Sequence, residues 1–316
     1  MAVIKENRRR DIRFVLISIC ISFLVLKFGS TAPSSLAPVV THEASASQQQ
    51  QRHLKGDFQV VPNQCNSTKR GVFDKIYSEG SWQRGLRKPS DFYSGAAWPP
   101  NPIQQNSASG PGSNRGYMTV ASLKVLTDAI VKYNVTSMVD IPCGDVNWIF
   151  DSYITDTLPK YIGLDVTSAV IDVNKQRFGH HRNKRFFFWD ATECDMPMFY
   201  DGSSDNPQSV DLVHVRDVIQ HLTLAQGVKY YCHVFKTRPR ILVTTSHTRT
   251  DGRLINKDIK EGDCYDANIF LEPFSFPEGE GMDCFKHDAR EGREFTCVFD
   301  LRKHDDWVQN YLALKC

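Results

Sequence analysis

The stretch V-D-I-P-C-G-D-V-N-W, residues 139–148, decides how the rest of the chain is interpreted. An apolar run beginning at Val135 precedes it and predicts a short buried strand, followed by a turn at 142–145 and then a helix. Doubly wound α/β folds hold nucleotide-like ligands at such places, because glycine lets the backbone approach the ligand and the first N–H groups of a helix bind polar groups. Gly144 alone is a weak signal, so the flanking sequence must decide.

Apolar runs alternate with segments of helical spacing along the rest of the chain. Strands are expected at 160–166, 185–191, 210–215 and 239–245, and helices at 118–133, 147–155, 168–178 and 222–235. A closing edge strand is expected at 294–301 and a short helix at 307–314. This alternation predicts an α/β fold with a doubly wound, mainly parallel sheet and helices on both faces.

Four of the expected strands end in an aspartate: Asp140, Asp165, Asp190 and Asp217. Ligands of parallel sheets bind beyond the carboxyl ends of the strands, where these four side chains would gather. A carboxylate after the second strand can accept hydrogen bonds from both hydroxyls of a ribose. A single aspartate in this position is usually a turn or helix-cap residue, but four in register favour a ligand site.

The length and composition of the chain limit the possible domain organisation, partners and metal sites. A chain of 316 residues with 41% hydrophobic content can form one large domain with appendages. The first 28 residues hold six basic and two acidic residues, so the rest of the chain is slightly acidic and no nucleic-acid partner is expected. The cysteine and histidine spacings match no zinc site, so no metal is predicted.

The N-terminal residues predict a membrane anchor. A basic tail (1–13) precedes an apolar segment (14–28), which we interpret as an uncleaved signal anchor; a cleaved signal peptide and a buried core helix are alternatives. The positive-inside rule then makes the protein a single-pass type II membrane protein, with the tail in the cytoplasm and the main domain in the lumen of the endoplasmic reticulum or Golgi. If the segment is cleaved, the protein is secreted.

A stem and a lumenal domain are expected after this segment. Residues 29–56 are rich in Ser, Ala, Pro and Gln and predict a disordered stem, which leaves 57–316 as the domain. Two glycosylation sequons, at Asn66 and Asn134, agree with a lumenal location. Several cysteines could form disulfides in this oxidising compartment, although the sequence does not give their pairing. The sequence does not indicate an oligomeric state.

Four motifs resemble the class I S-adenosylmethionine-dependent methyltransferases, over roughly residues 73–301. They are D-I-P-C-G-D (140–145), Y-I-G-L-D (161–165), F-W-D-A-T (188–192) and D-L-V-H-V-R-D-V-I-Q-H-L (211–222). More narrowly, S-G-P-G-S (109–113) and P-F-S-F-P (273–277) are similar to a group of small methyltransferase-like proteins. The resemblance implies a Rossmann-like methyltransferase fold with S-adenosylmethionine as the cofactor.

The resemblance also implies roles for single residues. Asp140, Gly144 and Asp145 would line the methionine moiety of the cofactor, and Asp165 would hold the ribose hydroxyls. Asp190 would accept a hydrogen bond from the adenine amino group, with Ala191 beside it, while Arg216, Asp217 and His221 would face the sulfonium and the methyl acceptor. The family turn has three glycines, and here Pro142 and Val146 replace the outer two, which we interpret as a variant turn.

The methyl acceptor is the least determined part of the prediction. Asp217, His221 and His247 are the candidate catalytic bases, although the first two could equally cap the following helix and the third could be a loop residue. The segment 247–283 lacks helical spacing and could select the acceptor through a loop that carries Asn256, Asp258, Gly262 and Asn268. It could equally be a surface loop stapled by disulfides around Cys264 and Cys284.

The sequence therefore predicts a methyltransferase of the secretory pathway that acts on an unidentified glycan, secreted protein or small metabolite. Two alternatives stay open. A non-catalytic binding protein could keep the fold, since two family glycines are missing. A glycosyltransferase would share the order of anchor, stem and domain, but the chain has no Asp-x-Asp metal motif, which leaves only metal-independent types.

Overall fold

The computed structural model describes residues 59–61, 71–83, 107–117, 119–200, 209–248, 255–287 and 293–316. All of them belong to one compact unit, Gln50–Cys316, and the other unit, Met1–Gln49, lies outside the described residues. The tail, anchor and stem expected at 1–56 also lie outside them, so they stay predictions. None of the described helices has the length and apolar character needed to cross a membrane.

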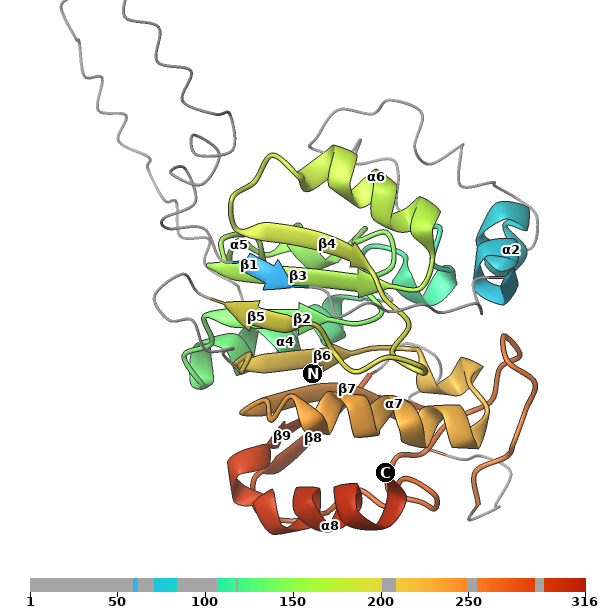
Figure 1. The fold of residues 1–316 in the computed structure, drawn as a ribbon, viewed down its shortest axis with the longest axis vertical. Helices are drawn as coiled ribbons and strands as arrows, with labels where there is room; N and C mark the ends of the chain where they lie inside the picture. Colours follow the sequence, from blue (N-terminus) through green and yellow to red (C-terminus); the bar gives the residue numbers. More distant parts are fainter. Residues whose placement is uncertain are drawn as a thin grey trace, which may run out of the picture. The chain divides into compact units, whose positions relative to one another are not determined.

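A seven-stranded sheet forms the centre of the compact unit (Figure 1). Its strands, in spatial order, are β4 (Lys184–Phe188), β3 (Lys160–Asp165), β2 (Ser137–Asp140), β6 (Leu212–Val215), β7 (Ile241–His247), β9 (Glu294–Asp300) and β8 (Met282–Lys286). The first five are parallel, whereas β9 runs antiparallel to both of its neighbours.

The order of the parallel strands places a switch point between β2 and β6. From β2 the chain adds β3 and then β4 on one side, and it returns to add β6 and β7 on the other. The connections on the two sides of this point leave the sheet in opposite directions, which opens a crevice at the carboxyl ends of the strands. The predicted doubly wound α/β fold is confirmed.

Helices cover both faces of the sheet because the central strands are apolar on both sides. In β2, Met138 lies on the face that packs with α4 (Val120–Lys132), α5 (Tyr153–Asp156) and α6 (Ser168–Phe178). Val139 lies on the other face, which packs with α7 (Leu224–Lys236) and α8 (Asp305–Lys315). A capping box between Thr223 and Gln226 begins α7. Figure 1 shows α7 and α8 together on one face.

The remaining elements are short. A separate two-stranded sheet pairs β1 (Gln59–Val61) with β5 (Met198–Tyr200). Helix α2 (Gly71–Glu79) precedes single 3₁₀ turns, which are η1 (Ser81–Gln83), η2 (Pro111–Ser113), η3 (Ile149–Asp151), η4 (Ile219–His221) and η6 (Leu301–Lys303). The helix expected at 147–155 is thus divided into η3 and α5.

One strand prediction was wrong. The segment expected to close the sheet as an edge strand is β9, which is internal, and the edge strand is β8. The sequence of β8 (M-D-C-F-K) gives no warning, because its side chains are half-buried or exposed and no continuous apolar pattern develops. A disulfide between Cys284 and Cys297 joins these two strands.

The segment between β7 and β8 is held by side chains and not by a disulfide between Cys264 and Cys284. The Asn256 amide donates hydrogen bonds to the carbonyls of Asn268 (2.8 Å) and Glu272 (2.9 Å). Asp258 accepts a hydrogen bond from the backbone N–H of Leu224 at the start of α7 (2.8 Å). These contacts fold the segment back over the carboxyl ends of the strands.

The motif P-F-S-F-P has a packing role. Phe274 and Phe276 are buried against Tyr231 and Phe235 of α7, with ring centroids 4.7 to 5.9 Å apart. A second disulfide, Cys232–Cys316, joins α7 to the end of the chain after α8. This motif therefore stabilises the layer formed by α7 and α8.

Candidate functional site

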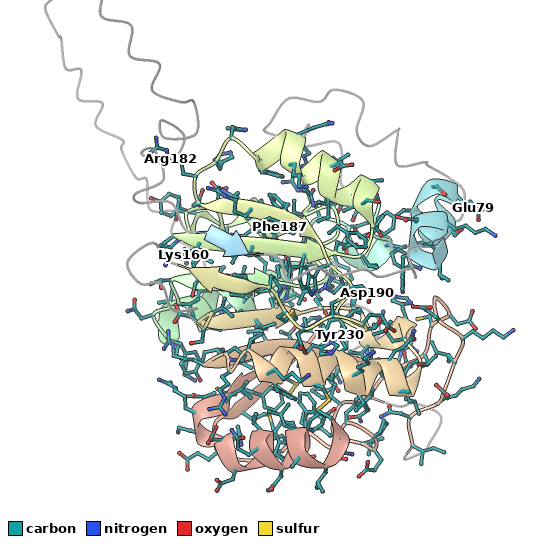
Figure 2. The ribbon with its side chains drawn as sticks, in the orientation of Figure 1. Glu79, Lys160, Arg182, Phe187, Asp190 and Tyr230 are labelled. Atoms are coloured by element: carbon teal, nitrogen blue, oxygen red, sulfur yellow. A yellow bond between two sulfur atoms is a disulfide. The ribbon has the colours of Figure 1, made fainter. Side chains whose placement is uncertain are left out.

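A cavity of about 350 Å³ opens where β2, β3, β4 and β6 end, at the switch point of the sheet. Its volume lies within the range of small-molecule pockets, about 300 to 1,000 Å³. Two of its lining residues, Asp190 and Tyr230, are labelled in Figure 2. Most of the site residues expected from the sequence lie on its wall: Asp140, Gly144, Asp165, Asp190, Ala191, Arg216, Asp217 and His221. Asp145 and His247 are not among the lining residues.

Asp165, at the end of β3, is held by two backbone donors. Its carboxylate accepts hydrogen bonds from the N–H of Gly144 through Oδ2 and of Thr167 through Oδ1, each at 2.9 Å. Burial raises the pKa of Asp165 to about 6, although these two bonds oppose the shift. Each carboxylate oxygen keeps further acceptor capacity, so the group can still receive two hydroxyl donors from a ligand.

Asp190 follows β4 and has a similar local anchor. The backbone N–H and the hydroxyl of Thr192 both donate to its Oδ1, at 2.9 and 2.7 Å. Ala191 and Trp189 also line the cavity here, and both are buried. This part of the wall combines one carboxylate with apolar surface, which suits a flat heterocycle that carries an amino group.

Gly144 occupies a position that accepts no side chain. Its φ of +54° lies in the left-handed region, and a Cβ there would come within 2.3 Å of Ser109 Oγ. Val146 also has a positive φ, +45°, which a β-branched residue rarely adopts. The variant turn therefore keeps a left-handed residue at the position of the third family glycine.

Asp145 points away from the cavity and holds the segment 107–109. Its carboxylate accepts hydrogen bonds from the Ser107 hydroxyl (2.7 Å) and the Ala108 N–H (2.8 Å), and burial raises its pKa. The Ser109 hydroxyl accepts a bond from the Asp145 N–H at 3.1 Å. Asp145 therefore anchors the S-G-P-G-S segment, which lines the cavity, and its expected contact with a methionine moiety stays a prediction.

Asp140 is part of a buried network that the sequence analysis missed. Its two oxygens accept hydrogen bonds from His214 Nδ1 (2.7 Å) and the Tyr161 hydroxyl (2.6 Å). Burial and the Asp140 carboxylate raise the pKa of Tyr161 well above its usual value, so it remains a proton donor. Because Nδ1 is the ring nitrogen that contacts Asp140, Nε2 is the one left for a ligand, and His214 lines the cavity. A histidine inside the apolar run 210–215 was the available signal.

Arg216 links several chain segments at the acceptor side of the cavity. Its guanidinium contacts Asp217 (3.2 Å) and Glu294 (3.4 Å) and donates to the carbonyl of Gly112 (2.9 Å). It also stacks over Trp148, 5.1 Å from the ring centroid. Arg216 therefore joins the S-G-P-G-S segment to the ends of β6 and β9.

The three expected catalytic residues divide into two groups. His221 lies in η4 at the cavity wall, where its Nδ1 is 2.9 Å from the Asp263 carbonyl and its ring packs against Trp82. Asp217 and His247 lie together with Glu294, within 4.8 Å of one another through their side-chain oxygen and nitrogen atoms. Glu294 was not expected from the sequence.

Solved structures that resemble this chain include several methyltransferases, all at low similarity. The magnesium protoporphyrin IX methyltransferase ChlM from Synechocystis, with bound S-adenosylmethionine, is 11% identical over 75% of this chain and 100% of that chain, with a TM-score of 0.44. The N-methyltransferase NodS from Bradyrhizobium japonicum, in complex with S-adenosylhomocysteine, is 14% identical over 71% and 97%, with a TM-score of 0.42.

The methyltransferase domain of bacterial CtHen1 is 14% identical over 59% of this chain and 100% of that domain, with a TM-score of 0.40. No protein-family model and no curated protein sequence matches this chain. Roles of single residues depend on the geometry described above.

Proposed function

We propose that this protein is an S-adenosylmethionine-dependent methyltransferase. One observation supports this most directly: carboxylates at the ends of consecutive strands, Asp165 and Asp190, line one cavity at the switch point of a doubly wound sheet. A ribose hydroxyl pair and an adenine amino group supply the donors that such carboxylates bind. The apolar surface of Trp189 beside Asp190 is suited to an adenine ring.

The order of the strands supports one orientation of the cofactor. Adenine would lie at the end of β4, ribose at β3, and the methionine end at β2 and β6. Both oxygens of Asp140 are engaged by His214 and Tyr161, so His214 is the residue that would meet the methionine ammonium group, through Nε2. When bound, the cofactor supplies an electrophilic methyl group on its sulfonium. Arg216 and Asp217 line the remaining end of the cavity, where the acceptor would enter.

The second candidate is a binding protein that keeps this fold without catalysis. The residues that favour it are Pro142 and Val146, which stand where the family turn has glycine. Such a protein could bind S-adenosylmethionine without transferring its methyl group. Both candidates should bind the cofactor, so a binding measurement tests only the site. Release of S-adenosylhomocysteine during incubation with acceptor mixtures is expected of the methyltransferase alone and separates the two candidates.

We propose further that the protein acts in the secretory pathway as a type II membrane protein, on a glycan, a secreted protein or a small metabolite. The apolar segment 14–28 and the two sequons support this location. The disulfides Cys232–Cys316 and Cys284–Cys297 are typical of proteins folded in an oxidising compartment.

Calorimetric titration of the full-length protein with S-adenosylmethionine and S-adenosylhomocysteine tests the cofactor site. Asp165→Ala removes the ribose acceptor, and we expect it to weaken binding by more than about tenfold, since hydrogen bonds to a charged group contribute about 1.5–3 kcal/mol. Asp172→Ala, on the exposed surface of α6, is the matched control and should bind as the wild type does. Failure of the folded wild-type protein to bind either compound would reject the proposal.

A further inference from the structure

Three side chains from three different strands meet beside the cavity. Asp217 follows β6, His247 ends β7 and Glu294 begins β9. His247 and Glu294 are direct partners in the ladder between β7 and β9, so the sheet fixes their relative position. Each of the three offers one ligand atom, and these atoms all lie within 4.8 Å of one another.

His247 lacks the hydrogen bonds that a buried imidazole normally makes. Only 5% of the residue is exposed, and its Nδ1 is buried without a hydrogen-bond partner among the described residues. An unsatisfied buried polar atom is costly, and such atoms in native proteins often mark an ion or ligand site. The imidazole therefore keeps a nitrogen available in a cluster that already holds two carboxylates.

We propose that Asp217, His247 and Glu294 bind one divalent transition-metal ion, of the Mn²⁺ or Zn²⁺ class. Carboxylate oxygens and an imidazole nitrogen together suit these ions, whereas Mg²⁺ and Ca²⁺ prefer oxygen ligands alone. Ligand atoms about 2.1 Å from one ion lie about 3.0–3.4 Å apart at octahedral and tetrahedral angles, so binding would draw the three side chains closer together than the present limit of 4.8 Å. This site differs from the prediction of no metal, which rested on cysteine and histidine spacing.

Among the described residues, a guanidinium and an imidazole contact the carboxylates of the cluster. Arg216 contacts both carboxylates and is itself anchored by Ser122 and Gly112. His287 Nδ1 lies 3.1 Å from Glu294 Oε1 and can orient that carboxylate, as residues behind metal ligands commonly do. The competing interpretation is that Arg216 alone balances the cluster and that no ion binds.

The position of the proposed ion indicates the chemical class of the methyl acceptor. This step rests on the proposed methyltransferase function. Asp217 lines the acceptor end of the cavity, so the ion would lie beside the incoming nucleophile. A bound cation lowers the pKa of a hydroxyl that contacts it, which would activate the acceptor as a nucleophile. The acceptor oxygen would form a bond to the methyl carbon as the carbon–sulfur bond breaks, its electron pair going to sulfur and the hydroxyl proton to water. The acceptor is therefore a hydroxyl compound.

Binding of Mn²⁺ alone to the chelator-treated full-length protein tests the site without the cofactor. We expect one ion per chain by calorimetry and electron paramagnetic resonance, and at least tenfold weaker binding in His247→Ala. Asp217→Asn, which keeps the shape and removes one charge, should weaken binding similarly. His221→Ala is the matched control, because it removes a histidine of the cavity wall that lies outside the cluster, and it should bind as the wild type does.

Two outcomes would overturn the metal site. One is a folded wild-type protein that binds no Mn²⁺ at millimolar concentration. The other is equal affinity in the wild type and in folded His247→Ala and Asp217→Asn. Because the measurement omits S-adenosylmethionine, loss of cofactor binding with intact Mn²⁺ binding would reject the proposed function and leave the metal site standing.

Discussion

The two ends of the cavity hold their charged groups in different ways. At the cofactor end, Asp165 and Asp190 are fixed by donors two residues further along the chain, Thr167 and Thr192. At the acceptor end, the charges of Arg216, Asp217 and Glu294 are fixed by one another, across strands far apart in the sequence. Local anchoring makes the first end less dependent on sheet register, although Asp165 also accepts a bond from the Gly144 N–H after the neighbouring strand. The second end exists only when β6, β7 and β9 are correctly aligned.

Removing a disulfide from the acceptor half should have the largest effect among the tests of this difference between the two ends. The acceptor half, residues 209–316, contains the disulfide between Cys232 and Cys316, which are separated by 84 residues. Replacing both with alanine should lower the free energy of unfolding by about 4 kcal/mol, because the unfolded chain gains conformational entropy. Urea denaturation measures this value. Since the cofactor end is anchored locally, we expect the folded variant to bind S-adenosylmethionine with unchanged affinity.

The control for that experiment is Cys143→Ala, which removes a buried thiol from the cofactor half, residues 107–200. It should cost about 1 kcal/mol, as small truncations of buried groups do. Equal losses in the two variants would show that the disulfide contributes little, and that the acceptor half does not depend on it.

Gly144 tests the turn that organises the cofactor end. In Gly144→Ala the new methyl group overlaps Ser109 and the residue keeps a left-handed φ. We expect a loss of about 3 kcal/mol in unfolding free energy, because left-handed backbone alone costs a non-glycine residue about 1–2 kcal/mol. Urea denaturation of Gly71→Ala provides the comparison, since a Cβ at Gly71 meets nothing within 4 Å. A Gly144 variant as stable as the Gly71 variant would contradict the close packing of this turn.

The pKa of Asp165 predicts how cofactor affinity depends on pH. Because burial raises this pKa to about 6, the carboxyl is mostly protonated at pH 5 and mostly ionised at pH 7. The ionised form accepts the two ribose hydroxyls, so affinity for S-adenosylmethionine should rise up to about tenfold between pH 5 and 7. Calorimetry at several pH values measures the change. The same rise in Asp165→Asn would assign it to another group.

The same difference between local anchoring and strand pairing separates the features that the sequence predicted from those that it did not. The strand ends, the turn and Asp165 are encoded by short contiguous motifs, and the bond from the Thr167 N–H to Asp165 closes within two residues. The bond from the Gly144 N–H to Asp165 joins two of these motifs across 21 residues. The edge strand β8 was missed because its pattern is not apolar, and its place depends on pairing with β9. The helix expected at 147–155 is divided, and a helical period alone cannot locate such a break.

The missed site residues share one cause. His214 pairs with Asp140 in the ladder between β2 and β6, and Glu294 pairs with His247 in the ladder between β7 and β9. Both pairs arise from the order and register of strands that are distant in the sequence, so no local pattern marks the pairing, although the histidine inside the apolar run 210–215 was a local signal for His214 itself. Asp145 was assigned to the cofactor because it stands in the motif, whereas its side chain turns toward Ser107 and Ala108.

Tyr161→Phe gives the smallest and most specific test, because it removes one donor from the hydrogen-bond network that joins β2, β3 and β6 at the cofactor end. Asp140 would keep its bond to His214 and lose the one from the Tyr161 hydroxyl, so we expect a loss of about 1 kcal/mol in unfolding free energy. Thermal denaturation of Tyr153→Phe, an exposed tyrosine of α5, is the matched control and should show no change. Because His214 stays oriented, cofactor affinity should change by less than threefold. A large loss of affinity together with the small loss of stability would mean that Tyr161, and not Asp140 alone, sets the direction of the His214 ring.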